Sequence, residues 1–208
     1  MDLSDLIPDV QLEASTIPDP LAMRELVRAA RELLTFSLAW QVDAIVNLTG
    51  ASQYFVYFPA ELAEPVSASY APTAGGASSR LLPTTVARLS AMNPSWRTLT
   101  GTPIEYYFND LNTVVFTPNP TSGVVTLRVA LRPTLDDPTI DDRVGAEFQE
   151  HIVHGALYRL LRMPKRSWSN ADMAAFYKDL FETDKGQARD RAVDNFSKVP
   201  RQVRYGGL

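Results

Sequence analysis

Apolar residues recur at helical spacing in two parts of the chain. From Leu21 to Phe36 they lie three or four residues apart, which is typical of an amphipathic helix. The same spacing returns from about Asp141 until Met163-Pro164 ends it, and again after Ser169, which we interpret as the N-cap of a further helix. The pattern therefore predicts one helix in the first of these segments and two in the second: residues 20–39 and 139–196.

The middle of the chain changes to the two-residue period of β-strands. Residues 40–49 alternate apolar and polar side chains, broken only at Ile45. Further β-rich runs, separated by turn residues, follow at 54–58, 104–108, 113–117 and 124–131. We expect the last three runs to form an antiparallel meander. Residues 60–80 show little periodicity, and a short helix is expected from about Pro83 to Met92.

Helices near both ends of a chain must pack together to bury their apolar faces. We therefore predict an α+β fold, in which a small helical bundle carries an inserted antiparallel β-rich subdomain and an extended C-terminal arm. The expected single domain, residues 1–208, divides into three parts: the bundle (20–39 and 139–196), the β-rich insertion (40–133) and the arm (197–208). We expect the insertion to project from the bundle.

Composition excludes several classes of chemistry. The 208 residues include no cysteine, so disulfides, thiol nucleophiles and thiolate metal sites are absent. No apolar run reaches the length of a membrane span, and the first ten residues lack the features of a signal peptide, so we expect a cytoplasmic origin and no membrane partner. The formal net charge of −4 indicates no general affinity for nucleic acid.

Charge is distributed unevenly along the chain. Residues 1–20 carry five acidic and no basic side chains, whereas residues 185–208 carry six basic side chains and two acidic ones, Asp190 and Asp194. An acidic head and a basic tail favour head-to-tail or partner contacts. Two solvated termini would give the same pattern, so both interpretations stay open.

Two clusters contain residue types that can bind metal ions. Glu147, Glu150, His151 and His154 are helical neighbours, but the order Glu-His-x-x-His differs from the zincin motif, and no second helix supplies a histidine. We predict no metal there, and interpret the histidines as ion-paired or satisfied side chains beside a subunit interface. The acidic cluster Asp136, Asp137, Asp141 and Asp142 lacks the calcium-loop spacing and is assigned to turns and helix capping.

The sequence also lacks the common catalytic motifs. No G-x-S-x-G occurs, and Gly75-Gly76 lacks the lysine and spacing of a P-loop. We therefore expect no catalytic residue, no cofactor and no enzymatic activity. A metal-dependent hydrolase centred on His151 and His154 remains the enzymatic alternative.

Several segments occur in an order that resembles a known family. They are Pro83-Thr84-Thr85, Trp96-Arg97, Gly101-Thr102-Pro103, Phe116-Thr117-Pro118-Asn119-Pro120, Leu127-Arg128-Val129-Ala130-Leu131-Arg132-Pro133, His154-Gly155-Ala156-Leu157-Tyr158-Arg159-Leu160-Leu161-Arg162-Met163-Pro164 and Trp168-Ser169. Over roughly residues 20–185 the chain resembles tailed-bacteriophage head-to-tail adaptors, also called connector or tail tubular protein A-like proteins.

The resemblance implies a structural virion protein of the neck or tail, assembled in the host cytoplasm. It implies a homo-oligomeric ring, commonly a dodecamer, that binds the portal on one side and tail or nozzle proteins on the other. DNA would pass through the ring without sequence-specific binding. Another tail or baseplate component is the alternative structural role.

The last residues are the predicted portal-binding element. Lys198, Arg201 and Arg204 form a cationic strip, and Tyr205 adds an aromatic side chain that can enter an apolar groove. Such an arm can order on a partner and wrap around it. The resemblance agrees, because adaptors of this kind commonly extend a terminal arm into the portal. The competing interpretation is an arm that lines the channel and contacts DNA phosphates.

Overall fold

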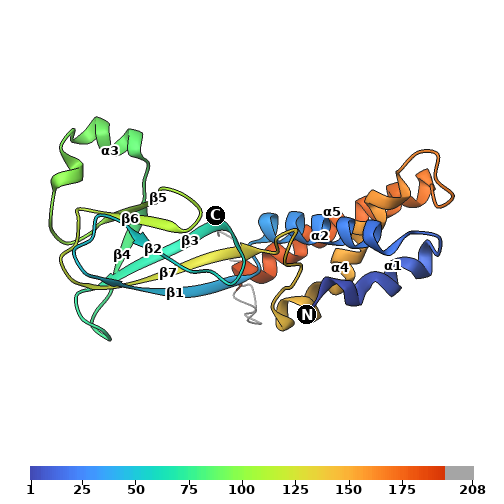
Figure 1. Ribbon diagram of the computed structural model, residues 1–208, viewed down its shortest axis with the longest axis horizontal. Helices are drawn as coiled ribbons and strands as arrows, with labels where there is room; N and C mark the ends of the chain where they lie inside the picture. The colour runs from blue at the N-terminus through green and yellow to red at the C-terminus, as the bar shows by residue number, and fades with distance from the viewer. Residues whose placement is uncertain (195–208) are drawn as a thin grey trace, which may run out of the picture. The chain divides into compact units, whose positions relative to one another are not determined.

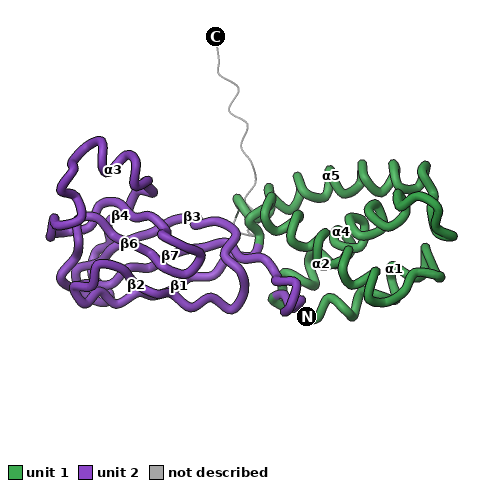
Figure 2. Tube along the Cα trace, turned by 45° about the horizontal axis from the view of Figure 1, so that its top comes forward, with its two compact units in different colours: residues 1–39, 141–208 green, residues 40–140 purple. Residues whose placement is uncertain are grey.

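The structure is a computed structural model that describes residues 1–194 (Figure 1). The chain divides into two compact units (Figure 2). Unit 1 contains Met1–Ala39 and the chain from Asp141 onward, and unit 2 contains Trp40–Ile140. The first is helical and the second is built on a β-sheet, so each has its own core.

Unit 1 is held together by three long helices. Its described elements are η1 (Leu3–Leu6), α1 (Ile7–Glu13), α2 (Asp19–Ser37), α4 (Asp142–Leu161) and α5 (Ala171–Val193). Helices α2, α4 and α5 pack against one another in all three pairs. Gly155 of α4 permits this packing, because a Cβ atom there would lie 2.9 Å from Cβ of Ala29 and 2.7 Å from the Phe181 ring.

An ion-pair network joins the same three helices. Lys185 of α5 donates to Glu32 of α2 over 2.8 Å, and Arg159 of α4 donates to the other carboxylate oxygen. Burial raises the pKa of Glu32, but Lys185 and Arg159 outweigh it and hold that pKa below its ordinary value. The charged form of Glu32 therefore stabilises the folded unit.

Side-chain caps fix where α4 and α5 begin. Asp141 accepts hydrogen bonds from the backbone N–H groups of Arg143 and Val144, which confirms the capping role expected for the acidic cluster. The N-cap of α5 is Asn170, whose side chain accepts from Met173 N over 3.2 Å. The expectation that Ser169 is this cap was wrong by one residue.

Unit 2 is a seven-stranded mixed sheet with one short helix and one 3-10 turn among its described residues. Its elements are β1 (Gln41–Leu48), β2 (Tyr54–Phe55), β3 (Glu61–Ala71), β4 (Ser79–Pro83), α3 (Val86–Met92), η2 (Trp96–Thr98), β5 (Glu105–Phe108), β6 (Thr113–Thr117) and β7 (Gly123–Arg132). The strand order is β1-β7-β3-β4-β5-β6-β2. The β4–β5 pair is parallel, and the other pairs are antiparallel.

Strand β7 forms the centre of one half of the sheet, between β1 and β3. Its residues Val125, Leu127 and Val129 are fully buried, whereas Thr126 and Arg128 are exposed, as the two-residue period requires. Arg128 binds the carboxylate of Asp43 on β1 through two hydrogen bonds of 2.7 and 2.8 Å. Arg128 holds the pKa of Asp43 below its ordinary value, mainly through the hydrogen bonds between the two side chains. Burial raises the same pKa, but by less.

The predicted fold, a small helical bundle with an inserted antiparallel β-rich subdomain, is wrong. The sheet is large, mixed and a compact unit of its own. Strand β3 was missed because register shifts at Leu62/Glu64 and Pro65/Ser67 break its alternation. The expected meander was also wrong, because β7 pairs with β1 and β3 instead of β6. The arm predicted over 197–208 lies outside the described residues.

Candidate functional site

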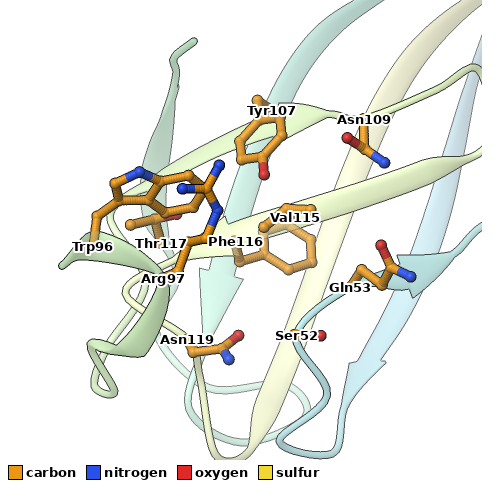
Figure 3. A pocket seen from close by; sticks show the side chains of 10 residues that line it. All are labelled: Ser52, Gln53, Trp96, Arg97, Tyr107, Asn109, Val115, Phe116, Thr117 and Asn119. Atoms are coloured by element: carbon orange, nitrogen blue, oxygen red, sulfur yellow. The ribbon is translucent and has the colours of Figure 1, made fainter. Parts of the chain in front are cut away.

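A pocket of about 200 Å³ lies beside strands β5 and β6 (Figure 3). Its lining combines aromatic and polar side chains from the sheet, from η2 and from the segment before β2. The ten residues are Ser52, Gln53, Trp96, Arg97, Tyr107, Asn109, Val115, Phe116, Thr117 and Asn119. The single charge among them is the guanidinium of Arg97.

The wall that carries this charge is rigidly positioned. Trp96 is only 5% exposed, and its indole N–H donates to Oγ of Ser90 on α3 over 3.2 Å. The Arg97 guanidinium carbon lies 4.4 Å from the Trp96 ring centroid, within the range of a cation–π contact, and Figure 3 shows the two side chains overlapping. The Tyr107 ring meets Trp96 edge-on at 5.8 Å. Burial raises the pKa of Tyr107, so its hydroxyl stays protonated at neutral pH.

Exposed apolar side chains continue the same face beyond the pocket. Phe55 is 73% exposed, Tyr57 81% and Leu111 56%. Phe55 pairs with Thr113, and Val56 N–H donates to the Asn112 carbonyl over 2.7 Å, so the register brings Tyr57 toward Leu111. We call Phe55, Tyr57 and Leu111 the outer patch. Clustered exposed apolar groups of this kind mark protein–protein contact sites.

The outer patch lies along a free sheet edge. Within residues 1–194, β6 is the only strand that pairs with β2. Because Val56 directs its N–H toward β6, the backbone groups of Phe55 and Tyr57 point away from the sheet. An edge with outward backbone donors and exposed aromatic side chains is suited to adding a strand or surface from another chain.

The second site is the histidine cluster between α4 and α5. Nδ1 of His154 lies 2.7 Å from Asp184 Oδ2, and Nε2 of His151 lies 3.9 Å from Asp184 Oδ1. Glu147, the acid that sequence spacing placed beside His151, instead accepts from Arg191 Nε over 3.0 Å. In the part of the chain that the structure describes, no group of three or more His, Cys, Asp or Glu side chains is arranged to hold a metal.

Sequence reasoning missed Asp184, because it lies 30 residues from His154 and only the packing of α5 on α4 brings them together. It also missed the outer patch, whose residues carry no motif. Trp96-Arg97 belongs to the segments that carry the family resemblance, but the sequence predicts no pocket there. The residues predicted to bind the portal lie outside the described residues; they are Lys198, Arg201, Arg204 and Tyr205.

Within residues 1–194, no helix is long and apolar enough to cross a bilayer.

A groove of about 340 Å³ lies next to the histidine cluster. It is formed by one wall of α4 and the last turns of α5, and Phe148 contributes apolar surface. Its lining residues are Glu147, Phe148, His151, Gln187, Asp190, Arg191 and Asp194. Three of these seven side chains are carboxylates and one is a guanidinium, so the groove is acidic. We call it the α4–α5 groove.

The surfaces of both units are thus suited to protein contacts. Comparison with known families shows what class of protein carries them: residues 1–204 match the family described as SU10 adaptor protein. The chain belongs to this family of phage head–tail adaptors, which confirms the resemblance at the level of the adaptor class. It is therefore a structural, virion-associated phage adaptor protein. No curated protein matches the chain.

Proposed function

We propose that this adaptor forms a ring between the portal and the tail, around the channel through which DNA passes. The observation that carries the proposal is the outer patch on a free sheet edge, in a protein of the adaptor family. Copies of one chain that meet through unlike surfaces close into a ring when the rotation between neighbours permits. Twelve copies and assembly in the host cytoplasm are carried over from the resemblance to connector and tail tubular A-like proteins.

Unlike surfaces are available within unit 2. The sheet ends in β1 on one side and β2 on the other. Ile45 of β1 is 70% exposed, and its neighbours Asp43 and Asn47 are exposed on the same face. In the proposed ring the β-rich insertion, residues 40–133, contacts neighbouring subunits or tail and nozzle proteins. The whole chain, residues 1–208, acts as a single adaptor domain in this proposal.

The arm, residues 197–208, is proposed to bind the portal. Its three basic side chains alternate with Val199, Val203 and Tyr205, so a partner groove can accept charge and apolar groups together. Repetition around a ring raises the effective concentration of every arm after the first has bound. Passing DNA makes no sequence-specific contact in this arrangement, and the net charge of −4 supports that view.

The test compares the full chain with a chain that ends at Asn195. Each is mixed with portal-bearing heads that lack the adaptor, and the particles are imaged by negative stain. The full chain should add a ring of density below the portal, and the shortened chain should not attach. Attachment of the shortened chain would show that the arm is not the anchor. Attachment of the full chain as isolated subunits would contradict the ring.

A further inference from the structure

The pocket beside β5 and β6 contains a buried hydroxyl group that the fold leaves unpaired. Thr117 lines the pocket and is only 5% exposed, and within residues 1–194 its Oγ1 has no hydrogen-bond partner. Glu105, the neighbour of Thr117 across the strand pair, lies 3.8 Å from Arg88 and does not line the pocket. A buried polar atom without a partner lowers the stability of a fold, so the pocket gains when a ligand accepts this hydrogen bond.

The guanidinium of Arg97 lies at the same pocket without an acidic partner. Its carbon is 4.4 Å from the centroid of the Trp96 ring, and in the part of the chain that the structure describes no carboxylate lies within ion-pair distance of it. Trp96 is itself held in place by its hydrogen bond to Ser90. Because the guanidinium is stacked on a fixed ring, it loses little freedom when it binds a ligand.

The other polar side chains of the lining can donate hydrogen bonds. The hydroxyl of Tyr107 keeps its proton at neutral pH, and the amides of Gln53, Asn109 and Asn119 carry N–H groups. Figure 3 shows these side chains on different sides of Phe116. The ten lining residues include no carboxylate. Several donors around a single positive charge complement a carboxylate, which only accepts hydrogen bonds and carries one negative charge.

The volume and position of the pocket indicate a side chain of a partner protein as the ligand. Its 200 Å³ is less than the roughly 300–1,000 Å³ of pockets that enclose small molecules, but is enough for one amino-acid side chain. The pocket also adjoins the outer patch along the chain, because Gln53 precedes Phe55 by two residues and Asn109 precedes Leu111 by two. Two residues span at most about 7 Å, so a chain that covers the outer patch can place a side chain in the pocket.

We propose that the pocket binds the carboxylate of an aspartate or glutamate side chain from a partner protein whose apolar residues cover the outer patch. Arg97 pairs with the negative charge, and Thr117 donates a hydrogen bond to a carboxylate oxygen. The inference rests on the proposed function in taking the outer patch as an interface. It adds the chemistry of the partner, which is an acidic side chain flanked by apolar ones.

Binding to the free, full-length chain tests the site without any assembly. The probe is N-acetylglutamate α-(N-methylamide), which carries only the side-chain charge, and the indole N–H signal of Trp96 is followed by NMR at constant ionic strength. A single side chain should give a saturable shift with a dissociation constant on the order of 1 mM. The uncharged glutamine analogue should bind at least about tenfold more weakly. Absence of a saturable shift, or tighter binding of inorganic phosphate, would overturn the proposal.

Two substitutions separate binding from folding. Arg97→Gln should abolish the response to the probe, whereas Arg166→Gln removes an arginine stacked on Trp168 outside the pocket and should leave the response unchanged. Thr117→Val should weaken binding about fivefold but leave the midpoint of thermal unfolding unchanged or higher, because the hydroxyl that it removes has no partner in the described fold. A lower midpoint with unchanged binding would show that the hydroxyl serves the fold, and the assigned role of Thr117 would be wrong.

Assembly distinguishes a failure of this inference from a failure of the proposed function. Arg97→Gln should lower incorporation into particles at least about tenfold, because a charge-paired anchor is lost. If Phe55→Ser with Tyr57→Ser lowers incorporation and Arg97→Gln does not, the partner places no carboxylate in the pocket and the inference is wrong, while the proposed function stands. If neither variant lowers incorporation, the outer patch is not an interface and both fail.

Discussion

At the scale of single residues, two glycines on neighbouring helices have opposite roles. Gly155 of α4 faces Ala29 and the Phe181 ring at distances too short for any Cβ atom, while nothing lies within 4 Å of the position that a Cβ atom would take at Gly186 of α5. The first glycine is therefore required by packing. Gly186 loses more backbone conformational entropy on folding than another residue would, and no close packing contact requires a glycine there.

Substitution by alanine should separate these roles. Gly155→Ala is expected to lower the free energy of unfolding by about 1 kcal/mol, because overpacking exceeds the gain in helix propensity. Gly186→Ala should raise it by about 0.5–1 kcal/mol, since the position is open. Urea denaturation followed by circular dichroism measures both. Stabilisation by Gly155→Ala would contradict the close approach of α4 to α2 and α5.

The free energy of unfolding of unit 1 should depend on pH through Glu32. Its folded-state pKa lies below the ordinary value of 4.5, so its contribution is present above that value and is lost as the pH falls through the folded-state pKa. Glu32→Gln should lower the free energy of unfolding by about 0.5–1 kcal/mol at pH 7, because the hydrogen bonds to Lys185 and Arg159 are weakened and solvent screens a side chain that is 37% exposed. The difference from the natural chain should shrink as the pH falls below 4.5.

Urea unfolding from pH 7 down to pH 3 measures this effect. Asp179→Asn serves as the control, because Asp179 is exposed and its stability profile should run parallel to that of the natural chain. A Glu32→Gln deficit that stays constant over the whole range would show that packing, and not the charge of Glu32, is responsible.

At the scale of elements, the start of α5 depends on one side chain. Asn170→Ala removes the hydrogen bond to Met173 N and should lower the free energy of unfolding by about 1 kcal/mol, as is usual for an N-cap. Ser169→Ala removes a neighbouring side chain of similar polarity and should change stability by less than about 0.5 kcal/mol. Thermal unfolding of the two variants compares them directly. A larger loss in Ser169→Ala would restore the cap that sequence spacing suggested.

The sequence predicts elements well where one period extends through the whole element. The long helices α2 and α4 have such a period, and strand β1 has it except at Ile45. Strand β3 does not, because two register shifts move its side chains from one face to the other. The order of strands was beyond sequence reasoning, since β7 pairs with two strands that precede it by 50 residues or more.

The candidate site was predictable only in part. The broken alternation at Ile45 signalled an apolar residue on the polar face of β1, and the structure places it 70% exposed. The exposure of Phe55 and Tyr57 could not be inferred, because residues 54–58 are all apolar or aromatic and the sequence does not say which of the two faces is covered. Pairing with β6 decides it: Tyr54, Val56 and Phe58 are buried, and the two residues between them face outward.

At the scale of the whole molecule, each unit presents a different kind of surface. Unit 1 has an acidic groove beside its histidine cluster, and unit 2 has an outer patch beside a pocket with one cationic side chain. Both surfaces use charge together with apolar area, a combination that gives specificity as well as affinity. A structural adaptor must recognise more than one neighbour, and the division of the chain into two units supplies separate surfaces for doing so.

The outer patch should be required for assembly and dispensable for folding. Phe55→Ser with Tyr57→Ser removes two side chains that are mostly exposed, so the free energy of unfolding should change by less than about 1 kcal/mol. Incorporation of the variant into particles should fall at least about tenfold, because aromatic anchors carry much of the energy of a protein interface. Complementation of an adaptor-deficient phage, scored by particle composition and infectivity, measures the loss.

Leu135→Ser is the control for this prediction. Leu135 is 65% exposed in the same unit but lies outside the outer patch, so its substitution should leave incorporation unchanged. If Phe55→Ser with Tyr57→Ser assembles like the control, the outer patch is not an interface, and the proposed ring would have to form through another surface.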